Sequence, residues 1–165
     1  MTQLRYLIIL VLTASLIGCD QNPEAADSAP SSIAENPQEL AMRAGAPLFA
    51  GMGDFSMPIT TNDADAQRYF DQGMVLAFAF NHAESIRSFK AAQTLDPDCG
   101  MCFWGEALAI GPNINVTSKG KVIMSAAERV AAFSAITKAL ALATKTTPRE
   151  QAYIEALAER YNGNP

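Results

Sequence analysis

The sequence is poor in the residues that enzyme active sites usually need. It contains a single histidine, His82. No Ser-His-Asp set, phosphate-cradling glycine loop or paired acids in a metal pattern stands out. A lone histidine without a carboxylate or serine partner cannot form an acid–base pair. We therefore expect no catalytic residue, no enzyme activity and no cofactor, and we interpret His82 as a solvated or capping residue in a turn between helices.

Positive charge and strand-forming runs are also scarce. The chain has 12 Lys and Arg residues and 17 Asp and Glu residues, which gives a formal net charge of −5 at pH 7. An acidic chain without a basic patch argues against binding nucleic acid or anionic lipid head groups by charge. Alanine is abundant, and alternating β-branched runs are missing. We therefore predict an all-α fold.

The longest apolar run lies at the N-terminus. Residues 6–17 are almost wholly apolar, follow Arg5, and are too short to span a bilayer as a stable helix. The run ends in the sequence LIGC, whose last residue is Cys19 and which resembles the bacterial lipobox. The resemblance implies a lipoprotein signal peptide over residues 1–18, acylation of Cys19 and attachment to a membrane. The alternative is an ordinary signal peptide or an uncleaved anchor with a chance cysteine.

The residue after the cysteine bears on location. In enterobacterial lipoproteins an aspartate in this place is a retention signal for the inner membrane, and here Asp20 follows Cys19. The resemblance therefore implies a cell-envelope protein at the periplasmic face of the inner membrane rather than at the outer membrane.

Residues 19–58 have the composition of a flexible tether. Five of the nine prolines lie there: Pro23, Pro30, Pro37, Pro47 and Pro58. Such a stretch cannot bury enough apolar surface to offset its ordering entropy. We predict a lipidated cysteine and a disordered tether over 19–58, in which residues 38–44 form a turn or two of helix. Leu48, Phe49 and Phe55 are apolar enough to dock on the first helices.

Residues 66–97 have the spacing of one tetratricopeptide (TPR) helix–turn–helix unit. The signature positions are Tyr69, Gly73 and Leu76 in a first helix, Ser85, Phe89 and Ala92 in a second, and a closing Pro97. The small side chains at 73 and 85 let two antiparallel helices approach, and the large ones fill the remaining space. Gln72 departs from the repeat, which usually has leucine there.

Part of this TPR spacing recurs at a distance of 34 residues along the chain. Helices are predicted over 98–110, 121–145 and 149–161, so the domain at 59–165 holds about two repeats and the first helix of a third. The core-facing stripe predicted for residues 121–145 consists of Val122, Val130, Phe133, Ile136, Leu140 and Ala143. Tyr153 and Leu157 form the apolar face predicted for the last helix. Because no second helix follows to complete the third pair, we expect either a truncated chain or a last helix that folds back.

Three segments of the sequence resemble segments found in a family of larger, exported bacterial TPR proteins. They are AQRYFDQGMVLAFAFNHAESIRSF, LDPDCGMCFWGEALAIGPNIN and REQAYIEALAERY. The resemblance implies TPR-like antiparallel hairpins in a short α-solenoid, with further repeats in the longer relatives. The family has no assigned reaction. A binding module is therefore expected, whose groove would hold a peptide or a partner protein. Candidate groove residues are Gln67, Arg68, Gln72 and Glu106.

Cys99 and Cys102 form a CxxC pair at a predicted helix start, where free N–H groups lower the pKa of the first thiol. The pair could be buried thiols or a local structural disulfide, a redox site, or part of a metal site. Phe103 replaces the histidine of a c-type haem motif, and the βαβ setting of thioredoxin is missing. With His82 there are at most three zinc ligands. A thiol redox or metal-handling protein is the alternative function.

Overall fold

The computed structural model describes residues 36–112, 117–118, 121–122 and 124–161. The predicted signal peptide at 1–18, the lipidated Cys19 and the tether up to residue 35 lie outside these ranges. The helices are α1 (Pro37–Ala44), α2 (Ala64–Phe78), α3 (His82–Leu95), α4 (Gly100–Ile110), α5 (Ala126–Leu142) and α6 (Pro148–Ala158), with a 3-10 turn η1 (Ala143–Lys145) before α6. None of these helices is long and apolar enough to cross a membrane.

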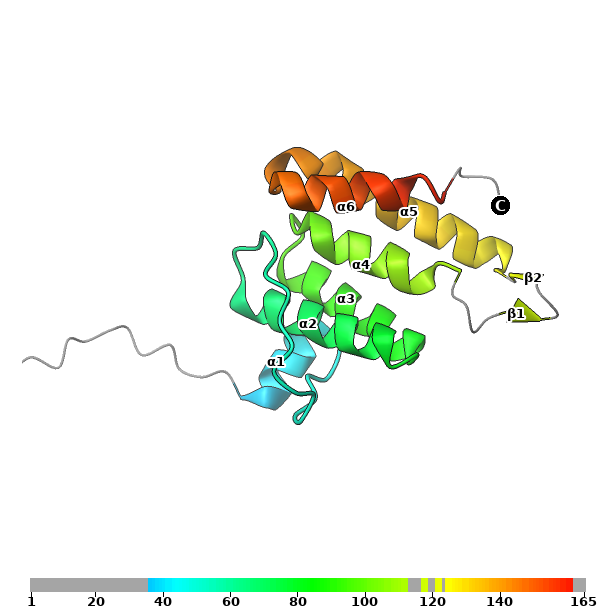
Figure 1. The fold of residues 1–165 in the computed structure, drawn as a ribbon. Helices are drawn as coiled ribbons and strands as arrows, with labels where there is room; N and C mark the ends of the chain where they lie inside the picture. The colour runs from blue at the N-terminus through cyan, green and yellow to red at the C-terminus, as the bar shows by residue number, and fades with distance from the viewer. Residues whose placement is uncertain (1–35, 113–116, 119–120, 123, 162–165) are drawn as a thin grey trace, which may run out of the picture. The chain divides into compact units, whose positions relative to one another are not determined.

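From α2 onward, successive helices stack in chain order as adjacent antiparallel pairs, and α1 packs mainly on α3 (Figure 1). This arrangement confirms the all-α prediction. A ladder of two residues on each side, β1 (Thr117–Ser118) with β2 (Lys121–Val122), is the one strand pairing within the described ranges. The predicted helix over 121–145 is therefore too long, because α5 begins at residue 126.

Side-chain caps fix where the helices begin. Asp63 accepts hydrogen bonds from the backbone N–H groups of Asp65 and Ala66 at 2.8 and 3.0 Å, which starts α2. Ser125 and Thr147 each form a reciprocal capping box, with Glu128 and Glu150 respectively. Each box satisfies two backbone N–H groups that a helix start would otherwise leave without partners.

The contact between α2, α3 and α4 is built around one aromatic ring. Phe89 of α3 is fully buried, and glycines face it from both neighbouring helices. A Cβ added at Gly73 of α2 would lie 2.7 Å from the ring, and one added at Gly105 of α4 would lie 2.3 Å from it. Phe70 of α2 packs edge-on against the same ring, with 5.5 Å between centroids. The two glycines therefore provide the space that the ring occupies.

The buried face of α5 differs from the predicted stripe. Val130, Phe133 and Leu140 are 51, 38 and 42 % exposed, so the prediction is wrong for these three. Among the predicted residues whose burial the structure describes, which leaves out Val122, Ile136 alone is fully buried and Ala143 is half-buried. The alanines Ala132, Ala135 and Ala139 are buried beside Ile136. Small side chains let α5 lie close to α4, and this close contact decides which face is inward.

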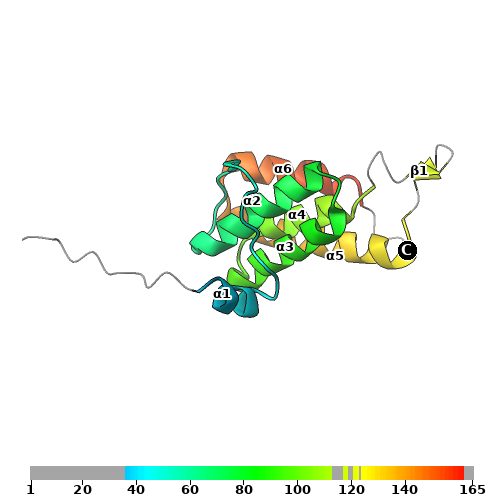
Figure 2. The same ribbon diagram turned by 90° about the horizontal axis from the view of Figure 1, so that it is seen from below.

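The segment 36–62 packs on the helices, so the predicted tether is wrong for residues 36–58. Leu40, Ala44 and Ala46 are buried, and α1 lies beside α3 (Figure 2). Leu48 is half-buried against the core as predicted, whereas Phe49 and Phe55 remain 42 and 45 % exposed. The proline-rich composition suggested a tether, but the segment is ordered by its own buried apolar residues and by side chains of α2 that bind its backbone.

Those side chains bind the backbone of the segment at several points. Gln72 accepts from the Phe49 N–H at 2.6 Å and donates to the Pro47 carbonyl at 3.0 Å. Gln67 likewise accepts from the Ile59 N–H and donates to the Met57 carbonyl, both at 3.0 Å. The two glutamines thus satisfy an extended backbone as a neighbouring strand would.

The same segment also reaches the start of α6. Glu150 is 3 % exposed, and its carboxylate accepts from the N–H and the hydroxyl of Thr60, both at 2.6 Å. It also accepts from the N–H and the hydroxyl of Thr147, at 2.8 and 2.7 Å. One buried carboxylate therefore joins segments 90 residues apart and caps a helix.

Candidate functional site

The turn between α2 and α3 carries an unusual residue. The Asn81 N–H donates to the Leu76 carbonyl at 2.9 Å and the Phe80 N–H to the Ala77 carbonyl at 3.1 Å, the two bonds of a Schellman helix end. Phe80 therefore occupies the left-handed position, with φ of 61°, where glycine or asparagine is usual. Among the described residues it is the one non-glycine with positive φ. A side chain with a Cβ costs about 1–2 kcal/mol in this conformation.

The aromatic side chains of this turn face solvent. Phe78 is 70 % exposed and Phe80 is 60 % exposed. The Phe80 ring lies edge-on to the His82 imidazole, with 6.4 Å between centroids. Two exposed phenylalanines on one turn form a small apolar surface, which we call the Phe78/Phe80 turn. The burial of such rings is a common source of interface energy.

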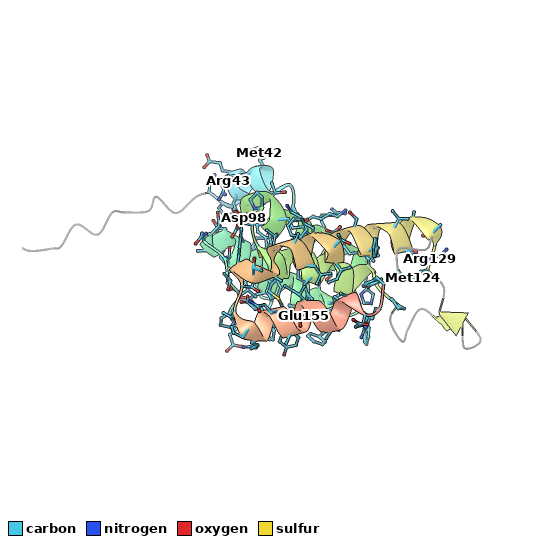
Figure 3. All side chains as sticks on the ribbon, turned by 90° about the horizontal axis from the view of Figure 1, so that it is seen from above. Met42, Arg43, Asp98, Met124, Arg129 and Glu155 are labelled. Carbon is cyan, nitrogen blue, oxygen red and sulfur yellow. A yellow bond between two sulfur atoms is a disulfide. The ribbon has the colours of Figure 1, made fainter. Side chains whose placement is uncertain are left out.

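Beside this turn lies a cavity of about 460 Å³. It is bounded by the start of α3, the end of α4 and the start of α5, and its walls are mostly apolar, as at Ile86, Ala109 and Ile110. Met124 also lines it and accepts a hydrogen bond through its carbonyl from Arg129 at 2.7 Å. Figure 3 labels both residues at this end of the helices.

His82 lines the cavity and differs from its predicted role. It is the first residue of α3 and is half-buried, and the helix start has no side-chain cap. Both ring nitrogens are buried, and neither has a hydrogen-bond partner within the described part of the chain. The expectation of a solvated or capping histidine is therefore wrong, because the ring turns toward apolar walls rather than toward water or the helix end.

The predicted groove residues do not all line one surface: Arg68 and Gln72 line a common cavity of about 220 Å³, whereas Glu106 lines another. Gln67 and Gln72 hold the segment 46–59, as described above. Arg68 pairs with Asp65 at 2.7 Å on the surface. Glu106 is 8 % exposed and pairs with Lys90 at 3.3 Å and Gln93 at 2.8 Å. Each of these side chains therefore has a partner within the chain, and none of these contacts assembles a groove.

Cys99 and Cys102 are joined by a disulfide in the first turn of α4. Both residues are fully buried, and the Cys99 sulfur accepts from the Cys102 N–H at 3.1 Å. A sulfur enclosed in this way is out of reach of an exchanging thiol unless the helix start opens. The described residues contain no group of three potential metal ligands. Burial therefore counts against both chemical alternatives for the pair.

The repeat positions are mainly inside the helical stack. Tyr69, Ser85, Phe89 and Ala92 are fully buried, Gly73 and Leu76 are buried, and Pro97 is exposed. Ser85 donates to the Gly73 carbonyl at 2.7 Å, so these two small residues meet at the approach of α2 and α3. Sequence reasoning missed Gly105, the second glycine against Phe89. Its signal was available, since an interior helical glycine suggests a packing need.

Comparison with protein-family models, with curated proteins and with solved structures finds no match to this chain.

Proposed function

We propose that this protein is a membrane-anchored scaffold of the TPR type, which binds another protein in the bacterial cell envelope. The observation that carries the proposal is the Phe78/Phe80 turn. Phe80 is held in a conformation that favours glycine, and its ring faces solvent. The left-handed backbone costs free energy, and the exposed ring recovers little of that cost through its single edge-on contact with His82, which favours a use for the ring outside the fold. A partner with an apolar groove wide enough for two aromatic side chains would bury both rings.

The helix packing supports the TPR part of the proposal. The contact of Phe89 with Gly73 is the kind of close approach that the repeat spacing predicts. Pairs that stack edge to edge leave their turns and outer faces for binding, as repeat proteins do. The sequence LIGC supports the anchor, since a lipid on Cys19 would hold the helices near a membrane surface.

A photocrosslinking experiment tests partner binding. A benzoylphenylalanine is placed at the exposed Ala79, between the two rings, and a matched one at the exposed Ala141 on α5. In cell envelopes the first position is expected to give a discrete protein adduct that the second does not. Phe80→Gly is expected to reduce the adduct about tenfold, as loss of a central aromatic contact does. A missing adduct, or one that survives Phe80→Gly combined with Phe78→Ser, would contradict the proposal.

The same variant separates function from folding. Phe80→Gly relieves the left-handed backbone, so it should raise the free energy of unfolding by about 1 kcal/mol while it weakens partner binding. A variant that is more stable and less functional cannot be explained by misfolding. If Phe80→Gly instead lowers stability, Phe80 has a structural role and the proposal loses its main support.

The anchor has its own test. Mass spectrometry of the mature N-terminal peptide should find an acylated Cys19, and Cys19→Ser should release the protein from the membrane fraction. An uncleaved N-terminus that stays in the membrane after Cys19→Ser would show an ordinary anchor instead.

A further inference from the structure

The cavity beside α3 combines apolar walls with one unsatisfied polar side chain. Its volume of about 460 Å³ falls within the range of small-molecule sites. Ile86, Ala109 and Ile110 supply apolar surface, while the two nitrogens of His82 are buried without partners. A buried polar atom without a hydrogen bond costs about 1–3 kcal/mol, and native proteins contain few of them. A ligand that satisfies the ring would recover this cost.

The chemistry of the imidazole ring limits which polar group such a ligand can carry. A neutral imidazole has one nitrogen that donates and one that accepts. A hydroxyl group both donates and accepts, so it can bond either nitrogen whichever carries the proton.

The charge on the cavity wall disfavours an anionic ligand. Besides His82, the only ionisable side chain on the cavity wall is Glu128, among the described residues. Hydrogen bonds from the backbone N–H and the hydroxyl of Ser125 lower the pKa of Glu128, so its carboxylate is charged at neutral pH. No lysine or arginine of the described ranges lines the wall to offset that charge. An uncharged ligand avoids the repulsion.

We propose that this cavity binds a small uncharged molecule with an apolar body and one hydroxyl group, which hydrogen-bonds to His82. The inference does not depend on the scaffold proposal, because the ligand enters the cavity and the protein partner covers the exposed rings of Phe78 and Phe80. Each could hold without the other.

The single histidine gives a direct readout. In the full chain labelled with ¹⁵N-histidine, the ring nitrogens of His82 produce one set of signals. The probes are 4-ethylphenol, ethylbenzene and 4-ethylbenzoate, which share a body and differ in the polar group. 4-Ethylphenol should shift both ring signals saturably and bind about fivefold more tightly than ethylbenzene, as one additional hydrogen bond allows. 4-Ethylbenzoate should bind more weakly than either.

Two variants locate the site. His82→Phe keeps an aromatic ring and should make 4-ethylphenol and ethylbenzene bind equally. Ala127→Phe fills the cavity from an exposed position on α5 and should abolish binding of both, whereas Ala141→Phe, exposed on the same helix but off the cavity, should leave both unchanged.

Four results would overturn the proposal. They are no saturable shift with 4-ethylphenol, a preference that survives His82→Phe, binding that survives Ala127→Phe, and tighter binding of 4-ethylbenzoate. The last would show an anion site in place of a hydroxyl site.

Discussion

The two sides of α4 make contact in opposite ways. Toward α3, one large ring fills the space left by glycines, and Phe89 is fully buried between Gly73 and Gly105. Toward α5, the facing residues are mostly alanines, while the larger Val130, Phe133 and Leu140 point outward. In both contacts a small residue marks where helices approach. Large apolar residues mark the core only where the opposite helix leaves space for them.

The largest effect is expected on the α3 side. Phe89→Ala removes a ring that fills the space between two helices, and nearby glycines offer no side chain to collapse into it. The free energy of unfolding should fall by about 3–5 kcal/mol. Urea denaturation followed by circular dichroism measures this loss. A loss below about 1 kcal/mol would mean that the ring does not hold the helices together.

On the α5 side, matched variants test which face is inward. Ile136→Ala removes a fully buried side chain and should cost about 2–5 kcal/mol. Leu140→Ala, on the exposed face, should change stability by less than about 0.5 kcal/mol. Comparable losses for the two would show that the exposed face of α5 is covered, for example by another copy of the chain.

Adding a methyl group to one of the two glycines tests the close approach itself. Gly73→Ala places its Cβ 2.7 Å from the Phe89 ring and should cost about 1–3 kcal/mol through overpacking. Gly100→Ala is the control, since its Cβ would lie 3.1 Å from the Thr146 methyl, a milder contact than the 2.7 Å at Gly73. The melting temperature should fall clearly for the first and little for the second. The reverse order would place the tight contact elsewhere.

The smallest effect depends on pH and concerns the segment 36–62. Burial acts to raise the pKa of Glu150 and is the largest single influence, but the bonds from Thr60 and Thr147 together outweigh it and lower the pKa. The carboxylate therefore adds stability above the ordinary pKa of about 4.3, which is lost as the pH falls through the lower folded value. Glu150→Gln should cost about 1–2 kcal/mol at pH 7.

As the pH falls below the ordinary pKa of about 4.3, the difference in stability between Glu150→Gln and the natural chain should shrink, as measured by urea unfolding at pH 7 and pH 3. A constant difference at both pH values would show that shape rather than charge matters at this position. The pKa of Asp96 is lowered as well, so protonation of Asp96 also contributes to the loss of stability at low pH. Burial raises its pKa most, but bonds from Thr61, Asn62 and Asp98 and the charge of Lys145 bring it below the ordinary value.

Local spacing in the sequence was enough to predict the helices and the contact between Gly73 and Phe89. The face of α5 was not predictable in this way, because large apolar residues on both sides of an alanine-rich helix leave the inward face to its neighbours. Order in residues 36–58 was also missed, since it depends on burial of Leu40, Ala44 and Ala46 and on glutamines 8 to 25 residues away that bind the backbone. No composition count contains that information.

The candidate site likewise combines features that the sequence predicts with features that only the fold reveals. His82 was noticed as the only histidine, but its buried nitrogens depend on the packing of three helices around a cavity. Phe80 was not singled out, because only the backbone conformation shows that it stands where glycine is usual. The cysteine pair was found by spacing, whereas its burial depends on the fold.

A double-mutant cycle tests the central claim that Phe89 holds α3 and α4 together through the space at Gly105. The unfolding free energies of Gly105→Ala, Phe89→Leu and the double variant are compared with that of the natural chain. The smaller leucine should make room for the added methyl group, so the double variant should lose at least about 1 kcal/mol less than the sum of the single losses. Losses that add within about 0.3–0.5 kcal/mol would show that residues 89 and 105 do not share that space.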